Sequence, residues 1–162
     1  MSATNRGAKR RKADFYPTPL SAFLPLLPYL DRELVHHDPA CGDNRLVDCL
    51  RENKFMASGD DLAYGADFLE FDSYKPCILT NPPFSLAEEF ITVARAHSKE
   101  CFMLLRLNFL GGQKRKAFWK LNKPDALFVL SERPSFTGDG KTDACEYAWF
   151  YWGKRHKGIF HI

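Results

Sequence analysis

The chain has 162 residues, 45% of them hydrophobic and 14% aromatic, which suits the core of one globular domain and excludes an intrinsically disordered chain. No apolar run approaches the ~18 residues of a membrane span, and no signal-peptide pattern opens the chain, so we expect a cytoplasmic protein without a membrane partner. The net charge of +3 is compatible with nucleic-acid binding but does not require it.

The predicted elements alternate between helix and strand along most of the chain. Residues 1–13 carry five basic side chains and are predicted to form a flexible basic arm, which leaves 14–162 as a single domain. Prolines in 16–30 predict a turn and a short, kinked helix. Apolar residues at helical spacing predict helices over 44–54, 85–99 and 114–122. Apolar runs predict strands within 33–44, 55–61, 77–84, 101–110, 126–132 and 145–152.

Strands that alternate with helices predict an α/β three-layer fold with a mainly parallel sheet. Only a loop separates the last two predicted strands, so one antiparallel strand is expected near the C-terminus. Ligands of open α/β sheets bind at the carboxyl ends of the strands. The residues that follow each strand are therefore the first candidates for a functional site.

Several of those residues suit a nucleoside-like ligand. Gly42, in the loop DPACGDN (38–44), lets the backbone approach a ligand, and Asp38 can accept a hydrogen bond from an ammonium or hydroxyl group. Asp60 ends the second strand, where a carboxylate typically holds a ribose diol. Asp67 can accept from an exocyclic amine, and Phe68 can pack on a ring. Each is an ordinary turn or core residue by itself, but together they describe a nucleoside-shaped pocket.

The tetrapeptide Asn81-Pro82-Pro83-Phe84 ends the third apolar run. An amino group conjugated to an aromatic ring is a poor nucleophile because its lone pair is delocalised. The side-chain oxygen of Asn81 and the carbonyl of Pro82 can accept its two hydrogens and localise that lone pair, while Phe84 stacks on an extruded base. Orientation and electrostatics would then accelerate the reaction without a metal ion. The alternative interpretation is a strand stop followed by a helix cap.

These motifs, in this order, resemble the class I S-adenosylmethionine-dependent amino methyltransferases, and most closely the small phage or prophage DNA N6-adenine methyltransferases. The resemblance covers roughly 14–152, and NPPF is specific for amino methylation more than for adenine. It rests on DFYPTP (14–19), DPACGDN (38–44), GDD (59–61), ADF (66–68), NPPF (81–84), LLRLNFLGG (104–112), SERPSF (131–136) and EYAWFYW (146–152).

The resemblance implies a Rossmann-like methyltransferase fold, S-adenosylmethionine as cofactor and adenine N6 in DNA as the methyl acceptor. Catalysis is assigned to Asn81, Pro82, Pro83 and Phe84. Cofactor binding is assigned to Tyr16, Thr18, Asp38, Ala40, Gly42, Asp60, Asp67 and Phe68. Nucleic-acid binding is expected of Arg10, Arg11, Lys114, Arg115 and Phe136. If the protein is encoded by a phage, it would act in the cytoplasm of the bacterial host.

Two features depart from the family. Asn44 stands where the family commonly has a second glycine, and no segment is left for a separate target-recognition domain. Sequence specificity is therefore expected from the loops 111–124 and 134–144, the basic arm, a second copy in a homodimer or a partner protein. The alternatives for function are methylation of an RNA amino group or a protein glutamine, and a catalytically weak decoy or subunit that binds the cofactor or nucleic acid.

Other conspicuous residues are assigned structural roles. The pair His36-His37 is predicted to fill a strand or turn and not to bind a metal. The five cysteines, an odd number without a Cys-x-x-Cys pair, are predicted to be reduced and mostly structural, with Cys41 no nucleophile. The aromatic residues of 147–152 are predicted to be core.

Overall fold

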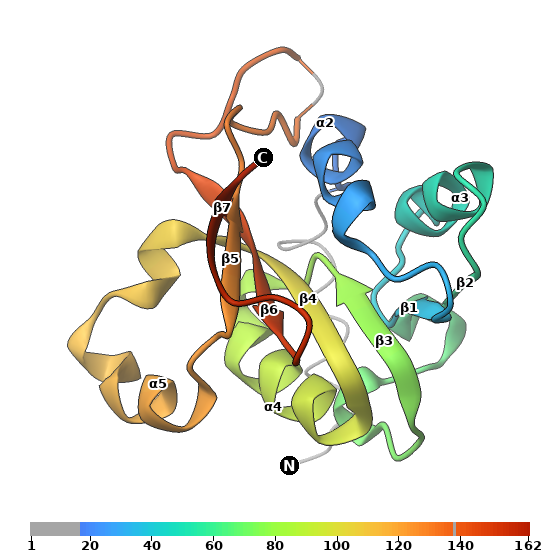
Figure 1. Ribbon diagram of the computed structural model, residues 1–162, viewed down its shortest axis with the longest axis horizontal. Helices are drawn as coiled ribbons and strands as arrows, with labels where there is room; N and C mark the ends of the chain where they lie inside the picture. Colours follow the sequence, from blue (N-terminus) through green and yellow to red (C-terminus); the bar gives the residue numbers. More distant parts are fainter. Residues whose placement is uncertain (1–16, 138) are drawn as a thin grey trace.

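The computed structural model describes residues 17–137 and 139–162. The basic arm (1–13) with Arg10 and Arg11, and also Tyr16, lie outside these described residues. Within them, seven strands form one sheet in the order β2-β1-β3-β4-β6-β5-β7 (Figure 1). The strands are β1 (His36–Asp38), β2 (Ala57–Gly59), β3 (Lys75–Thr80), β4 (Ser98–Arg106), β5 (Ala126–Val129), β6 (Tyr147–Trp152) and β7 (Gly158–His161).

The sheet is mostly parallel, as predicted. β1 pairs in parallel with β2 and β3, and β3 pairs in parallel with β4. β6 runs antiparallel between β4 and β5, which confirms the expected antiparallel strand near the C-terminus. β7, which pairs in parallel with β5, was not predicted, because a four-residue strand that starts at a glycine lacks a long apolar run.

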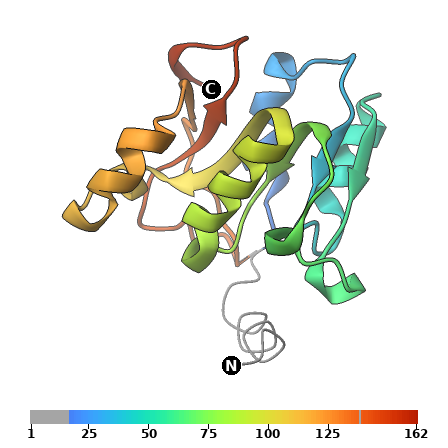
Figure 2. The same ribbon diagram turned by 90° about the horizontal axis from the view of Figure 1, so that it is seen from below.

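Helices cover both faces of the sheet (Figures 1 and 2). One core cluster joins α2, the 3₁₀ segment η1 and α3 to one face, and the other joins α4 to the opposite face, with α5 at its margin. This arrangement is the predicted three-layer α/β fold. The segments are α2 (Leu20–Phe23), η1 (Leu24–Tyr29), α3 (Arg45–Glu52), α4 (Ala87–His97) and α5 (Lys116–Asn122).

The 3₁₀ turns account for several boundaries that the sequence placed differently. η4 precedes α4, so this helix begins two residues later than predicted, and η5 ends the run that was assigned to a strand over 101–110. The proline-rich segment forms α2 and η1, in agreement with the predicted kinked helix. The remaining turns are η2 (Leu62–Tyr64), η3 (Phe68–Glu70), η4 (Phe84–Leu86), η5 (Leu107–Leu110) and η6 (Gln113–Arg115).

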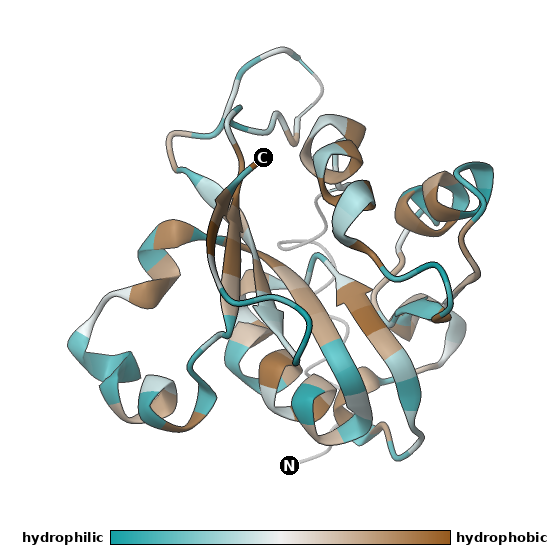
Figure 3. Cartoon of the chain, viewed as in Figure 1, coloured by the Kyte–Doolittle hydropathy of each residue, from teal (hydrophilic) through white to brown (hydrophobic). Residues whose placement is uncertain are grey.

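The central strands β4 and β6 are largely buried on both faces, and Figure 3 shows β4 changing from teal at its amino end to pale brown along the rest of the strand. Along β4, Phe102 and Leu104 belong to the cluster under α2 and α3, whereas Met103 belongs to the cluster under α4. This alternation follows from the two-residue period of a strand. In β6, Trp149 also donates from Nε1 to the Ala22 carbonyl at 2.8 Å, which ties α2 to the sheet. The prediction that the aromatic residues of 147–152 form core is confirmed.

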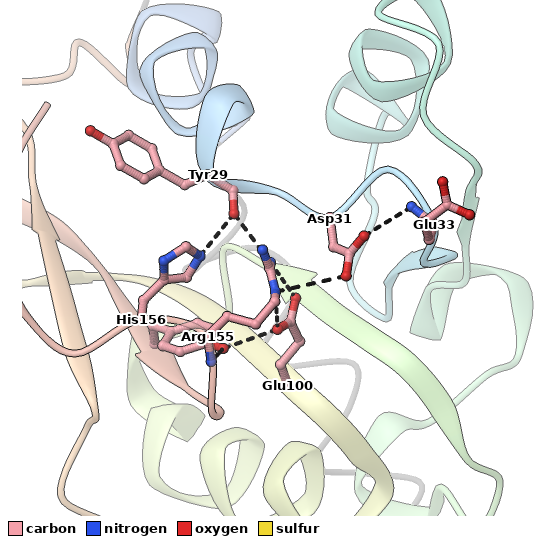
Figure 4. Close-up of polar contacts among 7 residues, drawn as sticks. Tyr29, Asp31, Glu33, Glu100, Arg155 and His156 are labelled. Atoms are coloured by element: carbon pink, nitrogen blue, oxygen red, sulfur yellow. Dashed lines mark hydrogen bonds and ion pairs between the residues drawn. The ribbon is translucent and has the colours of Figure 1, made fainter.

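A buried ion pair holds the amino end of β4 (Figure 4). Glu100, only 2% exposed, accepts from Nη2 of Arg155 at 2.7 Å and from the hydroxyl of Tyr151 at 3.0 Å. Arg155 also donates to the carbonyl of Tyr29 at 3.1 Å. Because these contacts place Glu100 inside the sheet, β4 begins at Ser98, where the sequence predicted the end of a helix.

All five cysteines are free, as predicted. His36 and His37 are buried in β1, and the described residues contain no cluster of three or more metal-ligating side chains. No helix in the described ranges is long and apolar enough to cross a membrane.

Candidate active site

The carboxyl ends of β1, β2, β3 and β4 lie at one edge of the sheet, because these strands run in parallel (Figure 1). The antiparallel strand β6 begins at the same edge, where Tyr147 pairs with Arg106. The loop 39–44, the tetrapeptide 81–84 and the segment before β6 therefore meet here. The prediction that the motif residues follow successive strands at one edge is consistent with this topology.

The loop after β1 is held by backbone contacts to the end of β2. Cys41 donates from its backbone to the carbonyl of Asp60 at 3.0 Å, and Gly42 donates to the carboxylate of Asp61 at 3.0 Å. Gly42 has φ 53, in the left-handed region that glycine adopts without steric cost. Ala40 donates to the carboxylate of Asp38 at 3.0 Å. The loop thus follows the strand ends closely.

Asn44 adopts a backbone conformation that favours glycine. It has φ 64 and ψ 8, so it occupies the left-handed conformation just before α3 begins at Arg45. Asparagine is among the few residues with a side chain that adopt this conformation routinely. Asparagine at this position is therefore compatible with the backbone path of the loop.

Gly59 gives the loop room on its inner side. A Cβ atom at this position would lie 2.8 Å from Cβ of Cys41 and 2.8 Å from Cγ2 of Val47. Real Cβ atoms do not approach so closely, so any larger residue would push the loop away from β2. Gly59 was quoted only as part of a motif, and the close contact gives it a specific role in packing.

Asp38 is the buried carboxylate of this edge, with 3% exposure. Burial raises its pKa to about 7, against the opposing effects of the Thr80 hydroxyl and the Ala40 amide, while Asp61 and Asp43 raise it further. A carboxylate held in this state gains most from a cation placed beside it. Asp38 is therefore suited to receive the ammonium group of a ligand.

The two acids after β2 face different neighbours. Asp60 is exposed and lies 3.4 Å from Nε2 of His37, and burial lowers the pKa of His37 to about 4. Asp61 accepts from the backbone of Gly42 at 3.0 Å and of Ala63 at 2.7 Å. The sequence analysis singled out Asp60 and passed over Asp61, although both stand in GDD. Asp61 is the acid that contacts the glycine loop directly.

Asp67 and Phe68 follow in a short turn. Asp67 is exposed and accepts from the backbone of Leu69 at 3.0 Å. Phe68 is 4% exposed and packs against Phe90, with 4.9 Å between the ring centroids. The exposed Tyr64 reaches back and donates to the carbonyl of Gly42 at 3.1 Å. An exposed aromatic ring thus stands beside the loop, which sequence analysis did not anticipate.

The tetrapeptide 81–84 directly continues β3. Pro82 is buried, whereas Asn81, Pro83 and Phe84 are partly exposed. β3 lies between β1, which carries the glycine loop, and β4. Asn81 consequently stands between two different surroundings, the loop side and the β4–β6 side.

The β4–β6 side is aromatic and cationic. The ring of Phe84 lies 6.0 Å from that of Tyr147, and the guanidinium carbon of Arg106 lies 5.2 Å from the Phe84 centroid. Phe136 packs on the same Tyr147 at 5.1 Å, so the loop between β5 and β6 reaches this side. Of these residues the sequence analysis assigned Phe84 and Phe136 to the site and Tyr147 to the core, and it did not name Arg106, which carries no local signal beyond a buried strand.

Other predicted site residues lie apart from this group or are already engaged. Arg115 donates to Glu88 at 3.1 Å and lies 4.3 Å from the Phe109 centroid, whereas Lys114 is exposed. Thr18 is buried just before α2.

No family model and no curated protein matches the sequence. The fold is similar to that of several solved structures, each at low sequence identity. A Pyrococcus horikoshii protein that bears the name of an RNA methyltransferase aligns with TM-score 0.59 and 14% identity over 87% of both chains.

Two further structures match over unequal lengths. A Listeria monocytogenes protein, named as a class I S-adenosylmethionine-dependent methyltransferase, has TM-score 0.56 and 16% identity over 90% of this chain and 65% of its own. The modification subunit of a Vibrio vulnificus protein named as a type I restriction enzyme has TM-score 0.57 and 16% identity over 96% of this chain and 48% of its own. The chain therefore has the Rossmann-like fold of these proteins.

Proposed function

We propose that this protein transfers a methyl group from S-adenosylmethionine to an exocyclic amino group, with N6 of adenine in DNA as the acceptor. The observation that carries the proposal is the position of Asn81, at the end of β3, between two complementary surfaces. On one side lies the glycine loop with the buried Asp38, and on the other lie Phe84, Tyr147 and Arg106. A methyl donor and a flat acceptor would meet at such a point.

The residues of the loop side fit the proposed cofactor. Asp38 suits an ammonium group, because a cation would relieve the cost of ionising a buried carboxylate whose pKa is raised to about 7. Asp60 and Asp61 offer carboxylate oxygens for a ribose diol beside the loop. Gly42 leaves no side chain in the way of close approach, and Gly59 lets the loop pack against the end of β2. When bound, S-adenosylmethionine supplies a methyl group activated by its sulfonium.

The residues of the tetrapeptide would prepare the acceptor. The side-chain oxygen of Asn81 and the carbonyl of Pro82 accept the two hydrogens of the amino group and concentrate its lone pair on nitrogen. Phe84 stacks on the ring to which the amine is attached. The chain contributes orientation and electrostatic stabilisation. The methylated amine then loses a proton to water, so no general base is assigned.

The choice of DNA adenine rests on the motif resemblance. The names of the Pyrococcus and Vibrio proteins refer to RNA methylation and to restriction–modification, so they support a nucleic acid without distinguishing the two. Methylation of an RNA amino group is therefore the second candidate. The intact tetrapeptide argues against a decoy, which has no need of it.

Transfer of labelled methyl groups to double-stranded DNA, single-stranded DNA and RNA, followed by nucleoside digestion, tests the proposal. We expect label in N6-methyladenine from DNA, and a loss of about 10²–10³ in rate for Asn81→Ala with cofactor affinity retained. Asn53→Ala, at the far end of α3, serves as the control and should keep full activity. Label in RNA alone would identify RNA as the substrate in place of DNA. Cofactor binding without methyl transfer to any nucleic acid would refute the proposed activity.

A further inference from the structure

Arg106 is held rigidly at the edge of the site where the acceptor would lie. It is the last residue of β4, and Nε donates to the hydroxyl of Tyr147 at 2.9 Å. Nη2 donates to Asp143 at 2.9 Å, and the Tyr147 hydroxyl donates to the same carboxylate oxygen at 2.7 Å. The three groups close a ring of hydrogen bonds, so the plane of the guanidinium is determined by the protein.

One nitrogen of this guanidinium remains available. Among the described residues, Nη1 of Arg106 has no hydrogen-bond partner, and the side chain is 41% exposed. The guanidinium carbon lies 5.2 Å from the centroid of Phe84 and 5.9 Å from that of Tyr147. A planar donor thus stands beside the ring on which the acceptor base is expected to stack.

Tethering the loop between β5 and β6 does not by itself account for this geometry. Asp143 already donates from its backbone to the Pro134 carbonyl at 3.1 Å and accepts from the Cys145 backbone at 3.2 Å. The same loop is also joined to the strand by an ion pair of Arg133 with Glu146. A residue that served only as a tether would not need to stand next to Phe84.

We propose that Arg106 is a specificity residue, whose Nη1 donates a hydrogen bond to a ring nitrogen of the base that stacks on Phe84. The inference rests on the proposed function and deepens it. Arginine has only donors, so its partner must be an acceptor. On the Watson–Crick edge, N1 of adenine and N3 of cytosine are acceptors beside the amine, whereas N1 of guanine and N3 of thymine carry a hydrogen. By a hydrogen bond at this edge, Arg106 would therefore select adenine and cytosine over guanine and thymine and turn the amine toward Asn81.

Removal of the ring nitrogens of adenine, one at a time, tests this assignment. The substrates are DNA and RNA oligonucleotides in which one adenine is replaced by 1-deaza-, 3-deaza- or 7-deazaadenine, each of which lacks one ring nitrogen. The proteins are the wild type, Arg106→Gln and the matched control Arg133→Gln, which removes the neighbouring ion pair of the loop. Methyl transfer and equilibrium binding of each oligonucleotide, with S-adenosylhomocysteine present, are measured in parallel.

We expect one deaza substitution to lower kcat/KM of the wild type by about 10- to 100-fold, as is usual for a lost contact to a base edge. Arg106→Gln should show a similar loss on adenine and no further loss on that analogue, because the same bond has been removed from both sides. Arg133→Gln should behave as the wild type. The dependence of affinity on salt should be equal for the wild type and Arg106→Gln.

Other outcomes overturn the assignment. Equal losses for Arg106→Gln on adenine and on all three analogues would mean that Arg106 acts only through the loop. A salt dependence reduced by about one phosphate contact in Arg106→Gln would place a phosphate at Nη1. If the wild type binds oligonucleotides but transfers no methyl group, the proposed activity fails, and the affinities for the three analogues still decide the role of Arg106. Absence of both binding and transfer refutes both proposals.

Discussion

Binding of the cofactor should be coupled to ionisation of Asp38. In the free protein, burial raises the pKa of Asp38 to about 7. An ammonium group beside the carboxylate would lower this pKa on binding, so the bound form has the ionised side chain. About a tenth of the protein is ionised at pH 6 and about nine tenths at pH 8 for a pKa near 7. Affinity for S-adenosylhomocysteine, which has the same amino-acid group, should therefore rise about tenfold over this range.

Titration calorimetry at pH 6, 7 and 8 measures this coupling. In buffers of different ionisation enthalpy, close to one proton should be released per ligand at pH 6 and few at pH 8. The pKa of His37 is about 4, so this histidine stays neutral over the whole range. Asp38→Asn should bind at least about tenfold more weakly at pH 8 and without the rise in affinity, because its side chain cannot ionise.

Two results would refute this reasoning. A wild-type affinity that is constant or falls between pH 6 and 8 would mean that Asp38 does not ionise on binding. The same pH dependence in Asp38→Asn would assign the proton to another group.

Three further predictions concern stability. Because the pKa of Asp38 is raised, the folded state keeps the proton of this side chain to higher pH than the unfolded chain, and stability falls as pH rises from about 4 to 7. In urea titrations, the free energy of unfolding of Asp38→Asn should exceed that of the wild type by roughly 4 kcal/mol at pH 8 and by little near pH 4. An equal difference at both pH values would contradict this prediction. Gly59→Ala should lower the free energy of unfolding by about 1–3 kcal/mol and weaken cofactor binding, because the added Cβ would meet the loop. The control Gly111→Ala, where the nearest atom is 3.5 Å away, should unfold at a temperature close to that of the wild type. Glu100→Gln should lower the free energy of unfolding in urea by about 2–3 kcal/mol, because Arg155 would keep a partly buried charge without its partner. An unchanged midpoint of urea unfolding would show that the ion pair of Figure 4 contributes little to stability.

The sequence was most informative where function depends on short motifs. The loop 38–44 and the tetrapeptide 81–84 could be located because glycine, proline and asparagine act on the backbone next to them. Their place after successive strands followed from apolar runs, and the common edge followed from the parallel order of the sheet. The same reasoning correctly anticipated an antiparallel strand near the C-terminus.

The elements that the sequence missed depend on contacts between distant residues. β7 exists because β5 offers it a hydrogen-bonding edge, and the start of β4 depends on the bond between Glu100 and Arg155, which are 55 positions apart. Asp61 could not be distinguished from Asp60 by sequence, because their difference lies in which one faces Gly42. Pairings of this kind leave no local pattern.

The sequence by itself determined the class of fold, the location of the glycine loop and the chemistry available at the end of β3, because each depends on the nature of a few neighbouring residues. Only the tertiary structure decided what surrounds that chemistry. Arg106, Asp143 and Tyr147 come from two strands and a loop, up to 41 positions apart, and meet because β4 and β6 pair in antiparallel register. The acceptor side of the site is therefore a product of strand pairing, which no single segment of the chain encodes.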